Sequence, residues 1–63
     1  MAHWDYLIAE KRENYWVYGD QELSEWFDEE EVLSLADKDG WELTAARLSF
    51  SGLPMLYFKR SRD

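Results

Sequence analysis

The first part of the chain alternates large apolar side chains with other residues, as β-strands do. Residues 3–11 place Trp4, Tyr6 and Ile8 on one face of an extended segment. Residues 15–18 form a second β-prone run that ends at a glycine. We expect the longer run to be a strand and the shorter one to be its hairpin partner or an edge strand.

The middle of the chain carries the local signals of a short helix. Asp28 is a good N-cap residue, and Glu31 stands three residues later, which is the spacing of a capping box. Apolar residues then recur at helical spacing, and Gly40 stands where a helix often ends in a residue with positive φ. These signals predict a helix over 29–38, which needs tertiary packing because short isolated helices are unstable.

The second half of the chain predicts two further strands. Residues 41–50 are the longest β candidate, although Leu48 and Phe50 fall out of phase with Trp41 and Leu43. A β-bulge near residues 46–47, or a strand covered on both faces, accounts for this change of phase.

Turn residues 51–54 lead into a last strand over 55–60, and we expect 61–63 to fray. The pattern is β–(β)–α–β–β, an α+β domain over 1–63 with an antiparallel sheet of three to four strands and one helix on one face. One helix leaves the other sheet face to solvent or to another subunit. The predicted structural core is Trp4, Tyr6, Ile8, Val32, Leu35, Ala36, Gly40, Trp41 and Leu43.

Size and composition favour self-association. A core built from 63 residues rarely supplies more than about 3–5 kcal/mol without a disulfide, a metal or oligomerisation. The chain has no cysteine and one histidine, so oligomerisation is the remaining means of stabilisation. Its four Trp, four Tyr and three Phe offer more ring surface than a small core hides, and aromatic residues are enriched at interfaces. The candidate interface residues are Tyr15, Trp16, Tyr18 and Trp26.

The formal net charge of −7 disfavours direct nucleic-acid binding and docking on anionic membranes. No apolar run approaches the ~20 residues of a spanning helix, and the start of the chain lacks the features of a signal peptide, so we expect a soluble cytoplasmic protein. The acidic residues between the second strand and the helix have two interpretations. They are a solvated helix start, or they are a patch that mimics phosphate and recruits a basic partner. The patch consists of Glu25, Asp28, Glu29, Glu30 and Glu31.

Three short motifs, taken together, resemble a known family. Trp4-Asp-Tyr6 near the start, Gly40-Trp-Glu-Leu43 after the helix and Phe58-Lys-Arg60 at the end are similar to domain-of-unknown-function family 4177, small domains of bacteria and phages. The chain departs from the family pattern within the helix, where Ser34 replaces the usual Asn and Ala36 the usual Leu. The resemblance implies the β-α-β-β fold, and the family has no established enzymatic activity to transfer.

The residue types do not assemble into a catalytic motif. The serines have only His3 as a possible base, and the glycines are isolated, so we expect no catalytic, cofactor-binding or metal-binding residues. Glu42 is expected to pair with Arg47, Lys59 or Arg60 across strands. The sequence therefore predicts a non-enzymatic interaction module that self-associates through an aromatic sheet face or an edge strand. The alternatives are an acidic decoy for a basic nucleic-acid-binding protein, and an oligomeric binder of a nucleotide or other small ligand.

Overall fold

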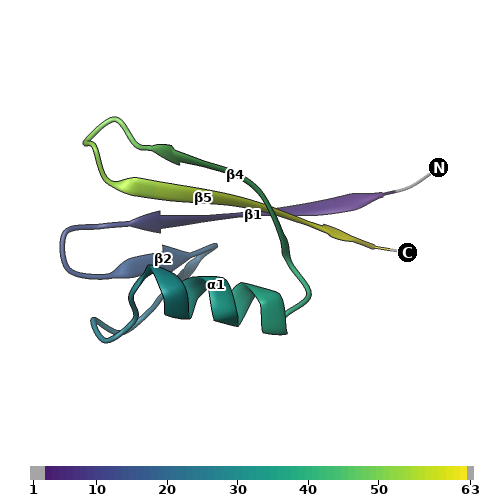
Figure 1. Cartoon of the computed structure of the whole chain (residues 1–63), viewed down its shortest axis with the longest axis horizontal. Coiled ribbons are helices and arrows are strands. Elements are labelled where there is room, and N and C mark those ends of the chain that lie inside the picture. Colours follow the sequence, from purple (N-terminus) through teal and green to yellow (C-terminus); the bar gives the residue numbers. More distant parts are fainter. Residues whose placement is uncertain (1–2, 63) are drawn as a thin grey trace.

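The computed structural model describes residues 3–62, which form one antiparallel sheet and one helix (Figure 1). The elements are β1 (Trp4–Lys11), β2 (Trp16–Tyr18), β3 (Gln21–Glu22), α1 (Glu29–Lys38), β4 (Glu42–Leu48) and β5 (Pro54–Ser61). The strand order is β3-β2-β1-β5-β4. The α+β class is confirmed, but the sheet has five strands instead of three to four. The extra strand forms because Gly19 and Asp20 turn the chain, so that Gln21 and Glu22 pair with β2.

The two central strands are β1 and β5, the first and last strands of the described chain. Their pairing runs from Trp4 opposite Ser61 to Glu10 opposite Met55. The backbone N–H of Arg62 donates to the carbonyl of His3 at 3.0 Å, beyond the end of the ladder. Residues 61 and 62 are therefore paired, the first with Trp4 of β1 and the second with His3, where the sequence predicted fraying; Asp63 lies outside the described residues.

Both ends of α1 follow the prediction. Asp28 Oδ1 accepts from the Glu31 N–H at 3.0 Å, and Glu31 Oε1 accepts from the Asp28 N–H, which completes the capping box. At the other end, the Trp41 N–H donates to the Ala36 carbonyl at 2.8 Å across Gly40, whose φ is +83°. This is the Schellman arrangement, and it fixes the direction in which the chain leaves the helix toward β4.

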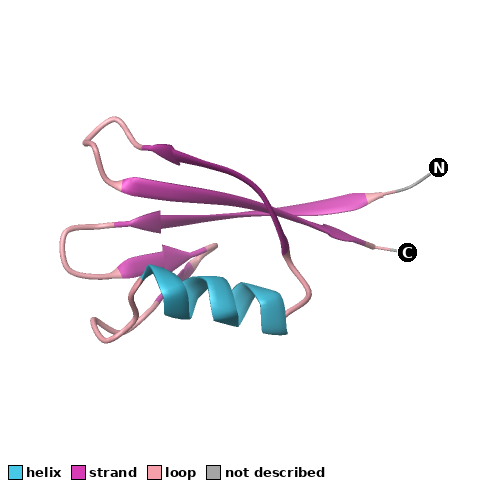
Figure 2. Ribbon diagram, in the orientation of Figure 1, coloured by secondary structure: helices cyan, strands magenta, loops and turns pink. Residues whose placement is uncertain are grey.

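The core lies between α1 and the sheet face that the helix covers (Figure 2). On β1, this face carries Leu7 and Ala9. The residues predicted on the core face, Trp4, Tyr6 and Ile8, lie on the opposite face and are exposed. The prediction was wrong because alternation separates two faces without saying which one the helix covers. The buried core is Ala9, Trp16, Tyr18, Leu23, Val32, Ala36, Leu56 and Phe58.

Four other predicted core residues also take peripheral positions. Leu35 and Trp41 are half-buried and pack against the core, whereas Leu43 and Gly40 are exposed. Leu43 is on the helix side of β4, but α1 does not extend over this edge of the sheet. The predicted bulge lies earlier than expected, since the register of β4 against β5 shifts between Leu43 and Ala45.

Candidate interaction surface

The sheet face away from the helix, here called the open face, carries a broad apolar surface. Successive side chains of a strand point to opposite faces, so the buried Ala9 and Phe58 place their immediate neighbours on the open face. Tyr6 is 74% exposed and Ile8 is 43% exposed. The strand registers assign the following apolar side chains to the open face: Trp4, Tyr6, Ile8, Val17, Ala45, Met55 and Tyr57.

The charged residues of the open face stand on either side of a central apolar row. The register aligns Ile8, Tyr57 and Ala45 as this row, across β1, β5 and β4. On one side of the row, Lys59 stands opposite Glu42, in the pairing register expected for Glu42, although no ion pair joins them within residues 3–62.

On the other side of the central row, Met55 stands between Glu10 and Arg47. Glu10 also pairs with Arg12 at 2.6 Å. Charges of both signs therefore flank the apolar row at each end of the open face.

An aromatic ring and a cation pack together near one end of the open face. The Nζ of Lys59 lies 4.3 Å from the centroid of the Trp4 ring. Such a contact is worth about 0.5–1 kcal/mol at an exposed site. Trp4 is still 40% exposed, so its ring adds to the apolar surface.

The candidate interface residues from the sequence are dispersed in the structure. Trp16 and Tyr18 are buried in the core beneath α1, at 2% and 7% exposure, so neither offers its ring as an exposed contact surface. Their strand is the second in the sheet order, with β3 outside it, and is not an edge. Tyr15 is half-buried, and Trp26 is exposed on the loop before the helix.

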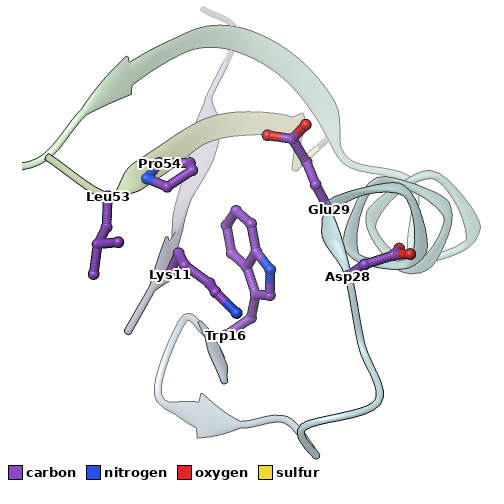
Figure 3. A pocket seen from close by; sticks show the side chains of 6 residues that line it. All are labelled: Lys11, Trp16, Asp28, Glu29, Leu53 and Pro54. Atoms are coloured by element: carbon purple, nitrogen blue, oxygen red, sulfur yellow. The ribbon is translucent and has the colours of Figure 1, made fainter. Parts of the chain in front are cut away.

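The residues of the acidic patch lie in different surroundings in the structure. Asp28 and Glu31 form the capping box, so their carboxylates are engaged by the helix end. Glu25 and Glu30 are exposed to solvent. Glu29 lies at the rim of a groove on the helix side, beside Pro54 (Figure 3).

A polar cluster at the helix C-terminus was not predicted. The Tyr18 hydroxyl donates to Asp39 Oδ2 at 2.9 Å, and Arg60 Nη1 donates to the Asp39 carbonyl at 2.8 Å. The Arg60 guanidinium also lies 4.1 Å from the centroid of the Trp41 ring. Burial and the hydrogen bond to Asp39 raise the pKa of the Tyr18 phenol above its ordinary value. The cluster joins β2 and β5 to the end of α1.

The sequence carried a signal for part of this cluster. A cation near a helix C-terminus interacts favourably with the helix dipole, and Arg60 is one of five basic residues in the second half of the chain. Its partner is set by the sheet order, because β5 lies between β4 and β1 and presents Arg60 to the helix side. That order is not visible in the sequence pattern.

The described part of the chain provides no group of three His, Asp or Glu side chains placed to hold a metal ion. It also contains no helix with the length and apolarity needed to cross a lipid bilayer.

Comparisons of the chain with known proteins returned no match to any family model, curated protein or solved structure. The resemblance of the three short motifs to family 4177 stays a prediction.

Proposed function

We propose that this protein is a non-enzymatic interaction module that binds a second copy of itself through the open face. The observation that carries the proposal is the continuous apolar surface around Tyr6, Ile8 and Tyr57, which the helix leaves uncovered. Contiguous apolar patches on a small protein mark interaction sites. Two sheets that pack face to face lie about 10 Å apart and bury both apolar surfaces.

The charges of the open face favour a second copy as the occupant. Consider a two-fold axis between the two sheets, perpendicular to the strands and over the central row. This axis exchanges the two ends of the face, so that Glu42 of one copy lies over Arg47 of the other. Lys59 of one copy then lies over Met55 of the other, next to Glu10. The Glu42–Arg47 contact joins opposite signs, and the axis repeats it, whereas Lys59 lies between Glu10 and Arg47 of the other copy.

The size of the face is also suitable. The molecule extends 39 by 23 Å along its two longer axes, an outline of roughly 900 Å². A standard specific interface buries about 800 Å² per partner. The outline belongs to the whole chain, helix included, so it sets an upper limit on the open face that is close to this size.

Sedimentation velocity over a range of protein concentrations tests the proposal. We expect a species of twice the 7.6 kDa chain mass whose population rises with concentration. Tyr6→Glu introduces a charge into the centre of the apolar surface and is expected to give a folded monomer. Trp26→Ala is the matched control, because it removes an exposed ring that lies off the open face. A wild-type monomer at millimolar concentration, or equal effects of the two substitutions, contradicts the proposal.

A further inference from the structure

A groove on the helix side of the sheet lies apart from the open face. Two adjoining hollows of about 310 and 330 Å³ share Glu29 and Pro54 as lining residues. Figure 3 shows the first hollow, with Trp16 at its base and the Glu29 side chain extending from the helix toward Pro54. We call these hollows together the helix-side groove; its walls include Trp16, Glu29, Ala46, Leu48, Leu53 and Pro54.

One wall of the groove is formed by β4, which is also a free edge of the sheet. β4 is last in the strand order, and all seven of its residues are exposed. The Ser49 N–H donates to the Leu53 carbonyl at 2.7 Å, in the same register that places Leu48 opposite Pro54. Because antiparallel ladders alternate, the backbone N–H and C=O groups of Leu48 and Ala46 point away from β5.

Ala46 and Leu48 therefore offer two features at once. Their backbone groups face outward at the edge, ready to pair with another strand. Their side chains line the groove, and Leu48 is 66% exposed there. A segment that pairs with β4 places every second side chain on the groove side, next to these two residues.

The groove accepts an apolar side chain beside a cation. Its lining is mostly apolar, and Glu29 stands at the point where the two hollows meet. The carboxylate of Glu29 makes no hydrogen bond or ion pair among residues 3–62, whereas Asp28 is engaged by the N-cap. Lys11 lines the first hollow and Arg47 the second, whereas Glu29 is the charged residue that lines both. The net charge of −7 further favours a basic partner.

We propose that the helix-side groove and the β4 edge together bind an extended basic peptide segment as a sixth strand. One apolar side chain of the segment enters the groove beside Leu48, and a Lys or Arg two residues away contacts Glu29. The helix-side groove shares only Arg47 and Met55 with the open face, so the same chain can form the proposed dimer and bind the segment.

The test uses a labelled eight-residue peptide in which leucine and lysine take turns at every second position, with threonine between them, so that one strand face carries both; in its twin, glutamate replaces each lysine. Fluorescence anisotropy measures binding, and ¹H–¹⁵N spectra of the protein locate it. We expect the basic peptide to bind at physiological salt, to shift the Ala46 and Leu48 amide signals, and to leave sedimentation of the dimer unchanged. The glutamate twin is expected not to bind.

Matched variants distinguish binding in the groove from general electrostatic attraction of the peptide to the acidic protein. Glu29→Gln is expected to weaken binding about fivefold, whereas Glu25→Gln, an equal charge change outside the groove, leaves it unchanged. Leu48→Asp is expected to abolish binding, and Ala46→Pro removes an outward N–H without breaking the ladder to β5. Circular dichroism verifies that each variant is folded, and Leu48→Asp, at an exposed site, provides the test if Ala46→Pro does not fold.

Three results overturn the proposal. Equal effects of Glu25→Gln and Glu29→Gln mean that the acidic surface attracts the peptide without a site. Equal binding of the two peptides removes the role of Glu29. Shifts of the Ala46 and Leu48 amides with protein concentration that persist in Tyr6→Glu show that a second copy occupies the edge. The first two results do not bear on the open-face dimer, which Tyr6→Glu tests separately.

Discussion

The hydroxyl of Tyr18 donates a hydrogen bond of 2.9 Å to the carboxylate of Asp39, the residue that caps the C-terminus of α1. Arg60 contacts the same residue from β5, through the Asp39 carbonyl. The end of the helix is thus attached to two strands that are not neighbours in the sheet. This attachment sets the position of the Gly40 turn and hence the start of β4.

Tyr18→Phe is expected to lower the free energy of unfolding at pH 7 by about 1–2 kcal/mol, because it removes a partly buried hydrogen bond to a carboxylate. The raised pKa of Tyr18 means that the folded state holds the phenol proton more tightly than the unfolded state. Its contribution is complete below the unfolded pKa of about 10 and is lost as the pH rises above that value.

Urea unfolding of both proteins between pH 7 and pH 11, followed by circular dichroism, measures this effect. The stability of the wild type is expected to fall more steeply above pH 10 than that of Tyr18→Phe. Tyr15→Phe, on a half-buried ring at the start of β2, is the control for loss of a phenol. Parallel curves for the wild type and Tyr18→Phe refute the assignment.

Trp41→Ala is expected to destabilise the domain by about 2 kcal/mol, less than the 3–5 kcal/mol of a fully buried tryptophan, because the ring is half-buried. Arg60→Met keeps much of the aliphatic contact with the ring and removes the guanidinium, so it should cost about 1 kcal/mol. The two residues are in contact, so the double variant should lose less than the sum of the single losses. Thermal and urea unfolding of the four proteins give the coupling, and strictly additive losses would contradict the contact.

Ala36→Leu is expected to destabilise the fold by about 1–3 kcal/mol, because Ala36 is fully buried where α1 meets the core, and an added side chain must displace its neighbours. Ser34→Leu is the matched substitution on the exposed part of the same helix and should stay within about 0.5 kcal/mol of the wild type. Urea midpoints at constant m-value measure both. Similar losses for the two would mean that α1 does not pack closely.

A charge exchange tests the orientation of the proposed dimer. Glu42→Arg alone, or Arg47→Glu alone, places like charges together at two symmetric contacts and should weaken self-association about tenfold. An equimolar mixture of the two variants restores opposite charges at both contacts and should form heterodimers. Sedimentation with one variant fluorescently labelled measures this, and a mixture that stays monomeric excludes the proposed two-fold axis.

The helix and its ends could be predicted from sequence because their causes are local. Asp28 and Glu31 cap each other within one turn, and Gly40 ends the helix through its own backbone. The core face of β1 could not be predicted in this way. Three large side chains lie on one face of that strand, yet the helix covers the other face, which carries the small Ala9. The packing of the helix against the sheet decides which face of β1 is buried. The alternation of side chains along a strand does not predict this packing.

The sequence predicted the kind of interaction surface, an aromatic sheet face or an edge strand, but not the residues that form it. An aromatic sheet face and a free edge do exist, but the rings near the end of β2 are buried. The long exposed edge is β4, because the two-residue β3 covers the outer side of β2 and forms the other edge. A two-residue strand carries almost no periodic signal, and its presence alone changes which strand is free.

The central position of β1 and β5 has a consequence for how the chain acquires its structure. The ladder at the middle of the sheet joins Trp4 to Ser61, residues at nearly opposite ends of the described chain. The β1–β2 and β4–β5 hairpins close short loops and can form early, whereas the pairing of β1 with β5 closes a long one. Contacts between distant residues slow folding, so this central pairing sets the rate at which the whole domain forms.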